Sequence, residues 1–138
     1  MQEYLFFPFA AWVLADHGAN VVNGETSGDP WMRQRGPYPG GTFDPEQSGL
    51  FLALNTSKRG VRLDLDSEAG SAELLGLIDW ADILIHDSKP AQAKALGLDA
   101  PTLEARRPDL VTLAISPFGS TGPYANFHAC LLYTSPSP

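Results

Sequence analysis

Short apolar runs alternate with segments of helical periodicity along most of the chain. In an amphipathic helix apolar residues recur every three to four positions, whereas a strand buried on both faces is apolar throughout. The helical pattern predicts helices over residues 8–17, 48–54, 67–80, 91–96 and 101–107. The apolar runs, with the alternating segment GVRLDL, predict strands over residues 20–23, 60–65, 82–86 and 110–115.

The order of these elements predicts an α/β fold. Alternating helices and strands are typical of an open, mostly parallel sheet with helices on both faces. The strand expected before the first helix is missing or reduced to residues 3–6, so we expect a partial domain whose natural start lies upstream. Ligands bind such sheets beyond the carboxyl ends of the strands. The loops to consider are therefore residues 24–26, 66–67, 86–89 and 116–119.

Several segments permit a functional and a structural interpretation. The Gly- and Pro-rich segment 28–47 is long for a connection inside a domain, and such loops are usually functional or disordered. His86, at a strand end, could act as a general base, although lone histidines are usually structural. Asp64 and Asp66 are predicted to share a strand face, where they could share a proton or be solvated. A basic cluster could be a solvated face or attract a polyanion; its members are Lys58, Arg59 and Arg62.

Composition and charge exclude several classes of protein. The formal net charge of −7 argues against general nucleic-acid binding, which needs a basic surface. The single cysteine, Cys130, excludes an internal disulfide and a thiolate metal cluster, and we expect no metal. The apolar start MQEYLFFPFAAWVLADHG lacks a basic region and is too short to span a bilayer. We therefore expect a cytoplasmic protein that is not attached to a membrane.

Four segments, in order and at matching spacing, resemble one family. They are PFAAWVLADHGANVV, GDPWMRQRGP, LNTSKRGVRLDLDSEAG followed by ADILIHD, and LGLDAPTLEARRPDLVTLAISPFGSTGPYA. Together they are similar to the amino-terminal part of family III CoA-transferases, also called CaiB/BaiF proteins. This family includes formyl-CoA transferase and α-methylacyl-CoA racemase. The resemblance runs from Pro8 to Ala129.

The resemblance implies a Rossmann-like large domain that binds coenzyme A, within an interlocked homodimer. It implies an enzyme of acyl-CoA metabolism that moves CoA between carboxylic acids through an aspartyl covalent intermediate. Its substrates would be an acyl-CoA and a carboxylic acid. The racemase branch would instead remove and return a proton beside the thioester. A third alternative is a CoA-binding module without catalysis.

The resemblance also places CoA contacts in the loops that the topology selects. The segment before the first helix falls on Leu5 and Phe6, and the "LDxK" strand falls on Leu63, Asp64, Leu65 and Asp66. The next loop falls on Asp87, Ser88 and Lys89, after His86. The last loop falls on Ser116, Pro117, Phe118 and Gly119.

Several positions depart from the family pattern. Phe7 replaces a glycine, and residues without positive charge replace basic or amide residues at Asn23, Asp66, Asp87 and Ala95. Positive partners for CoA phosphates are therefore fewer, unless others substitute for them; the candidates are Lys89, Lys94, Arg33 and Arg35.

The end of the chain departs completely from the family. We interpret residues 1–129 as the amino-terminal part of the CoA-binding domain and 130–138, CLLYTSPSP, as a non-native tail. The catalytic aspartate would then be absent, and we expect this fragment to be inactive. We also expect poor solubility, because apolar strand faces around residues 83–85 and 111–115 would be uncovered.

Overall fold

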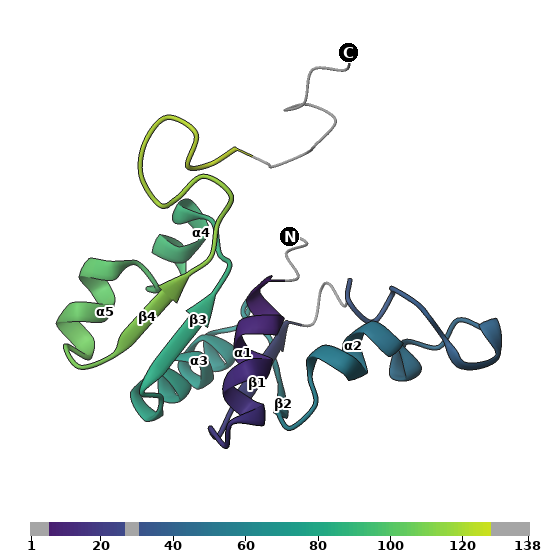
Figure 1. Ribbon diagram of the computed structural model, residues 1–138. Coiled ribbons are helices and arrows are strands. Elements are labelled where there is room, and N and C mark those ends of the chain that lie inside the picture. Colours follow the sequence, from purple (N-terminus) through teal and green to yellow (C-terminus); the bar gives the residue numbers. More distant parts are fainter. Residues whose placement is uncertain (1–5, 27–30, 128–138) are drawn as a thin grey trace, which may run out of the picture. The chain divides into compact units, whose positions relative to one another are not determined.

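The computed structural model describes residues 6–26 and 31–127. Strands and helices alternate along the chain, so the α/β class predicted from the sequence is confirmed (Figure 1). The elements are α1 (Phe6–Asp16), β1 (Val22–Thr26), the 3-10 turns η1 (Pro39–Gly41) and η2 (Pro45–Gln47), α2 (Gly49–Leu54), β2 (Arg59–Leu63), α3 (Glu68–Trp80), β3 (Ile83–His86), α4 (Pro90–Ala95), α5 (Ala100–Arg106) and β4 (Val111–Ala114).

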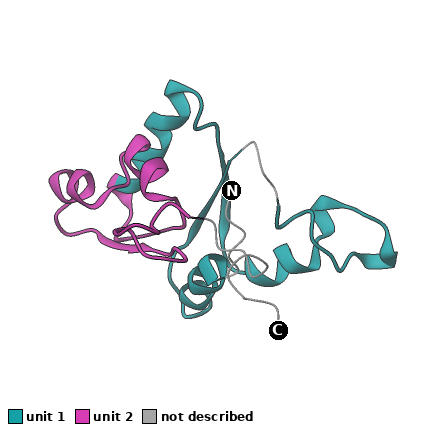
Figure 2. Cartoon of the chain, turned by 90° about the horizontal axis from the view of Figure 1, so that it is seen from above, with its two compact units in different colours: residues 1, 3–78 teal, residues 2, 79–138 magenta. Residues whose placement is uncertain are grey.

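The chain divides into two compact units, shown in teal and magenta in Figure 2. The first unit runs to Ile78 and the second begins at Asp79. In the first, β1 pairs with β2 in parallel, and in the second, β3 pairs with β4 in parallel. The mostly parallel pairing predicted from the sequence is therefore present in the described residues as two parallel pairs, one in each unit.

The strand boundaries differ from the predicted ones, and the carboxyl ends of β1 and β2 are the ones that affect the site. β1 extends to Thr26 because Gly24 to Thr26 pair with β2. β2 stops at Leu63 because the chain turns there, with the Ser67 N–H donating to the Asp64 carbonyl at 3.1 Å. Asp64 and Asp66 therefore lie in a turn, and the prediction that they share a strand face is wrong.

The helix boundaries follow the sequence pattern more closely. Gly18, with φ of 94°, ends α1 in the left-handed conformation that a helix-terminating glycine adopts. α1 begins at Phe6, so this part of the strand considered over residues 3–6 is helical, and residues 3–5 lie outside the described ranges. Within the described residues, no helix is long and apolar enough to cross a membrane.

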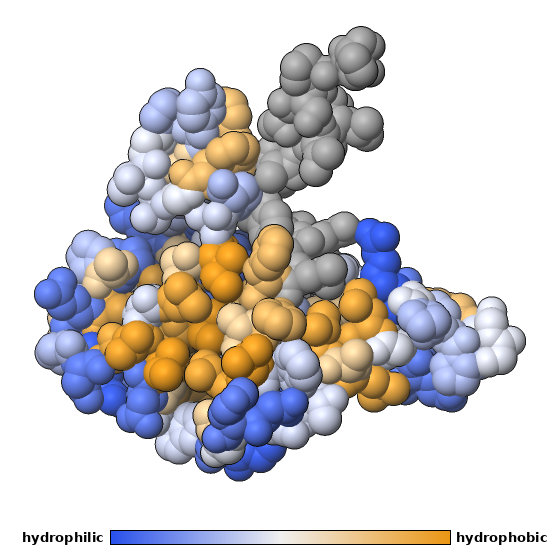
Figure 3. Space-filling view, viewed as in Figure 1, coloured by the Kyte–Doolittle hydropathy of each residue, from blue (hydrophilic) through white to orange (hydrophobic). Residues whose placement is uncertain are grey.

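The second unit leaves apolar strand residues exposed. Ala93, Leu98 and Leu103 are buried, but Ile83 is 47% exposed, and its partner in the ladder, Val111, is 60% exposed. Leu113, on the same face as Val111, is 44% exposed, and orange side chains gather over β3 and β4 (Figure 3). In the described residues β3 is therefore not covered on both faces, whereas the prediction of uncovered apolar strand faces is confirmed.

Candidate functional site

The first unit places one predicted CoA segment at the carboxyl edge of its sheet. Leu63, the last residue of β2, pairs with Thr26, the last residue of β1, and is buried. Asp64 and Asp66 follow and are exposed, and Leu65 is half-buried. This edge is where parallel sheets bind ligands.

Hydrogen bonds to the start of α3 hold the turn after β2. The Ser67 hydroxyl donates to the Asp64 carbonyl at 2.8 Å and accepts the Gly70 N–H at 3.0 Å. The Ser67 N–H also donates to the Asp64 carbonyl. Ser67 therefore caps α3 and also fixes the residues just before it.

The second unit brings two other predicted segments to one sheet edge. Asp87, Ser88 and Lys89 follow β3, and residues 116–119 follow β4. His86 pairs with Ala114, and the Ile115 N–H donates to the His86 carbonyl at 2.8 Å. The parallel pairing thus sets both loops at the same carboxyl edge. Ser116 and Pro117 are half-buried, Phe118 is exposed, and Gly119 has a positive φ of 80°.

Two titratable groups at this edge are perturbed by burial. His86 is only 9% exposed, and its Nδ1 has no hydrogen-bond partner among the described residues. Burial lowers the pKa of His86 and raises the pKa of the neighbouring Asp87. Both shifts favour the uncharged form of the side chain. The interpretation of His86 as a general base stays a prediction.

The segment before α1 is described only in part. Phe6 is the first residue of α1 and is exposed, and Leu5 lies outside the described residues. Phe6 belongs to the unit that holds residues 63–66, whereas residues 87–89 and 116–119 belong to the other.

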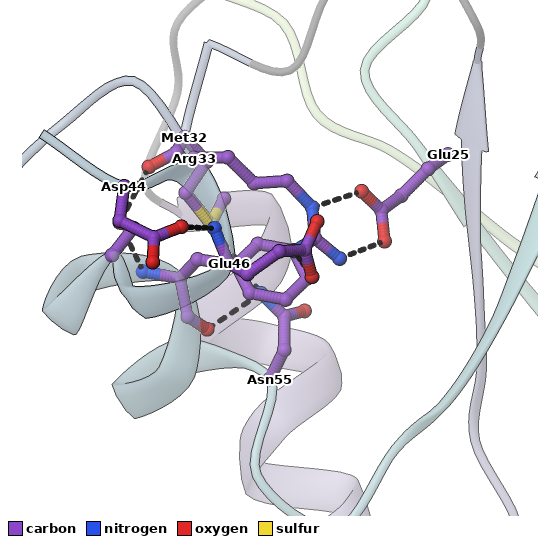
Figure 4. Close-up of polar contacts among 8 residues, drawn as sticks. Glu25, Met32, Arg33, Asp44, Glu46 and Asn55 are labelled. Atoms are coloured by element: carbon purple, nitrogen blue, oxygen red, sulfur yellow. Dashed lines mark hydrogen bonds and ion pairs between the residues drawn. The ribbon is translucent and has the colours of Figure 1, made fainter.

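The described part of the long loop, residues 31–47, is anchored to β1 by Arg33 (Figure 4). The Arg33 guanidinium donates two hydrogen bonds to Glu25, at 2.8 and 3.0 Å, and a third to Glu46 at 3.2 Å. It also lies 3.7 Å from the centroid of the Phe51 ring. The bonds to Glu25 raise the pKa of Arg33. The Arg33 guanidinium is thus already bonded to two carboxylates of the protein. These bonds argue against Arg33 as a substitute ligand for a CoA phosphate.

Ser48 gives the same loop a second anchor. Its hydroxyl is fully buried and lies 2.9 Å from the Met32 carbonyl and 2.6 Å from the Arg35 carbonyl, either of which it can bond. It also accepts the Phe51 N–H at 3.2 Å and caps α2. The described part of the loop is therefore tied to α2 by hydrogen bonds.

The predicted basic cluster is split in the structure. Arg59 and Arg62 are exposed, whereas Lys58 is half-buried. The Lys58 ammonium donates to the Pro8 carbonyl at 2.8 Å and to Asn55 Oδ1 at 3.1 Å. Burial lowers the pKa of Lys58 to about 8. Lys58 therefore links α1 to the end of α2, and it does not belong to a solvated basic face.

Sequence reasoning missed the Arg33–Glu25 pair. Glu25 and Arg33 are eight residues apart across a loop, and no local pattern marks such a pair. The sequence offered only an acidic residue near the end of a predicted strand and an arginine in the segment that follows, and neither identifies the other as its partner. Within the described residues, no three His, Cys, Asp or Glu side chains gather as metal ligands.

Comparison with known proteins assigns the chain to a class of enzymes and then to a family. The model of CoA-transferase family III matches residues 1–131. Because this match covers most of the chain, the chain belongs to CoA-transferase family III.

Two curated relatives and one solved structure illustrate the similarity. The chain is 35% identical over 121 residues to subunit BbsE of succinyl-CoA:(R)-benzylsuccinate CoA-transferase from Thauera aromatica, with 87% of this chain and 29% of that protein covered. It is 35% identical over 130 residues to succinate–glutarate CoA-transferase from Agrobacterium fabrum, with 92% and 32% covered. A CAIB/BAIF family protein from Brucella suis matches with a TM-score of 0.76 and 31% identity, with 88% and 32% covered. The chain thus spans about a third of the length of these proteins.

Proposed function

We propose that this chain supplies the CoA-binding part of an enzyme that transfers CoA between carboxylic acids. The observation that carries the proposal is the family match over residues 1–131. Relatives at 35% identity are named as transferases that use succinyl-CoA or act between succinate and glutarate. A thioester of CoA and a carboxylic acid are therefore the proposed substrates.

The proposed place for the cofactor is at the strand-end loops. The turn after β2 and the loops after β3 and β4 lie at the carboxyl edges of parallel pairs, where such folds bind ligands. The acidic replacements at these loops are less unfavourable than the sequence suggests. Asp66 is exposed to solvent, and the raised pKa of Asp87 favours its neutral form near a phosphate. Lys89, the half-buried residue just before α4, adds a positive charge two residues after Asp87 in the sequence.

The proposed chemistry is attack by an aspartate carboxylate on the thioester carbonyl of the acyl-CoA. A C–O bond forms and the C–S bond breaks, so the CoA thiolate leaves and an acyl–aspartyl anhydride remains. The thiolate then attacks the aspartyl carbonyl of this anhydride, which releases the donor acid and leaves an aspartyl–CoA thioester. The acceptor carboxylate attacks that thioester and displaces the thiolate, which gives a second anhydride. Attack of the thiolate on the acceptor's acyl carbon finally forms the new acyl-CoA and releases the aspartate carboxylate. We propose that the nucleophilic aspartate lies in the part of the relatives that this chain does not span. The 138 residues alone would then bind CoA without turnover.

The oligomeric state belongs to the same proposal. We propose that the active protein is an interlocked homodimer, as the family resemblance implies. The exposed apolar residues of β3 and β4 are consistent with a unit that has further contacts in the complete enzyme.

A chimeric enzyme tests the proposal. In the chimera, residues 6–127 replace the aligned segment of the Agrobacterium fabrum succinate–glutarate CoA-transferase. We expect the chimera to form succinate and glutaryl-CoA from succinyl-CoA and glutarate, and the 138-residue chain to form neither. A folded chimera that does not bind CoA in calorimetry would contradict the proposal.

The same chimera separates the alternatives. CoA binding without transfer would favour a non-catalytic module. Exchange of the proton beside the thioester for deuterium, without an acceptor acid, would favour a racemase-like reaction. The unaltered Agrobacterium fabrum enzyme serves as the control for both assays.

A further inference from the structure

The first turn of α3 lies against the backbone of Asp64 without room for a side chain at Gly70. A Cβ atom placed on Gly70 would be 1.9 Å from the Asp64 carbonyl oxygen, 2.5 Å from its carbonyl carbon and 3.0 Å from its nitrogen. All three are backbone atoms, so rotation of a side chain cannot relieve the overlap. Any other residue at position 70 therefore displaces either Asp64 or the start of α3.

This close approach works together with the Ser67 hydrogen bonds. Ser67 donates its N–H and its hydroxyl to the Asp64 carbonyl, and its hydroxyl oxygen accepts the Gly70 N–H. The carbonyl that Gly70 faces is thus the acceptor of both bonds that close the turn. The position of the turn over residues 64–66 is consequently set by residues of α3 and its cap.

A second glycine in α3, Gly76, shows that the lack of space at Gly70 is not a general property of glycines in this helix. Gly76 lies in the same helix, and a Cβ there would meet nothing within 4 Å. Inside a helix, glycine is less favourable than alanine by about 1 kcal/mol. We expect replacement of Gly76 by alanine to stabilise α3, whereas any side chain at Gly70 would clash with the backbone of Asp64.

We infer that Gly70 is a positioning residue for the cofactor: its missing side chain lets α3 hold the Asp64–Asp66 turn at the carboxyl edge of β2. The inference rests on the proposed function, because the importance of this turn depends on CoA binding there. Gly70 itself is buried beneath the turn and acts through Asp64.

Two readouts on matched variants test the inference. The variants are Gly70→Ala, Gly76→Ala as the control in the same helix, and Ser67→Ala, which removes hydrogen bonds without adding atoms. The first readout is hydrogen exchange of residues 64–67 in the 138-residue chain without CoA. We expect faster exchange in Gly70→Ala and Ser67→Ala, and unchanged exchange in Gly76→Ala.

The second readout is the KM for succinyl-CoA in the chimera. A misplaced binding group can cost up to roughly a hundredfold, and we expect Gly70→Ala to raise KM by at least about tenfold with a much smaller change in kcat. Ser67→Ala should raise KM less, and it remains informative where Gly70→Ala does not fold. Gly76→Ala should leave KM unchanged.

The outcomes distinguish this inference from the proposed function. A chimera without substitutions that fails to bind CoA contradicts the proposed function, and with it the role of Gly70 toward CoA. A chimera that binds CoA, with the same KM in folded Gly70→Ala and Ser67→Ala variants, overturns the inference alone. Unchanged hydrogen exchange at residues 64–67 in both variants also overturns it, because the turn would then not depend on these residues.

Discussion

The carboxyl edges of the two parallel pairs are built in different ways. In the first unit, hydrogen bonds hold the turn after β2, and an ion pair holds the described part of the loop after β1. The partners of these interactions lie within the unit. In the second, the edge contains the buried Nδ1 of His86, which has no partner among the described residues, and Asp87, whose pKa is raised by burial. Apolar residues of β3 and β4 are also exposed in this unit.

The first edge is therefore already arranged without a ligand, whereas some groups of the second edge lack partners among the described residues. Groups that are already bonded keep their positions without a ligand, so the first edge can receive a cofactor at little conformational cost. Buried polar groups without partners are unfavourable, and exposed apolar strands mark contact surfaces. We therefore expect ligand or further protein to complete the second edge.

The largest expected loss of stability in the first unit follows from removing its Arg33–Glu25 ion pair. Arg33 and Glu25 have side chains 20% and 28% exposed, so replacement of Arg33 by methionine should destabilise the chain by about 2 kcal/mol. The fall in the urea midpoint measures this loss. Arg106 makes a similar double contact with Asp79 in the second unit, but both are more exposed. Arg106→Met should shift the midpoint little, and equal shifts for both variants would contradict the account.

Ser48 tests the hydrogen bonds that tie the loop to α2. Ser48→Ala leaves the part-buried Phe51 N–H and the carbonyls of Met32 and Arg35 with fewer partners, which should cost about 1 to 2 kcal/mol in thermal or urea unfolding. Thr56→Ala is the control, because its exposed hydroxyl also bonds a carbonyl of α2. If Thr56→Ala costs as much as Ser48→Ala, burial of Ser48 is not what stabilises the loop.

Lys58 gives the first unit a pH-dependent stability. Its pKa falls from the ordinary 10.5 to about 8 on folding because of burial. Between these two values the unfolded chain binds more protons, so stability should rise as the pH increases from about 8 to 10.5. Lys58→Met should remove this rise in a series of urea unfolding curves. Lys94→Met, at an exposed lysine of α4, should retain it; a rise that persists in Lys58→Met would assign it to other groups.

The smallest change in stability is expected at the exposed strand face of the second unit. Val111→Thr and Leu113→Thr together should reduce self-association in light scattering while changing the unfolding midpoint little, because both side chains are largely exposed. Leu103→Thr, at a buried position of α5, should instead lower the midpoint strongly. Unchanged association in the double variant would show that this face does not cause it.

The sequence predicted most elements because their signals are local. Helical periodicity, the cap at Ser67 and the terminating glycine at Gly18 each depend on residues that are near neighbours. The boundaries of β1 and β2 were less accurate, since strand ends depend on pairing between residues about 37 positions apart, such as Thr26 and Leu63.

The candidate site was predictable in its location and not in its internal contacts. Topology and family resemblance both select the strand-end loops, which the structure places at the carboxyl edges. The local sequence does not indicate that Lys58 points inward, because its partner Pro8 lies fifty residues away in the chain. The overlap at Gly70 likewise depends on where α3 packs, which periodicity does not specify.

Hydrogen–deuterium exchange of the chimera, with and without CoA, tests the central claim most directly. The account predicts that CoA protects peptides covering residues 63–67, 86–89 and 115–119, and leaves the exposed end of α5 unchanged. Protection confined to other segments of residues 6–127, or none in a chimera that binds CoA, would contradict the assignment of the strand-end loops to the cofactor.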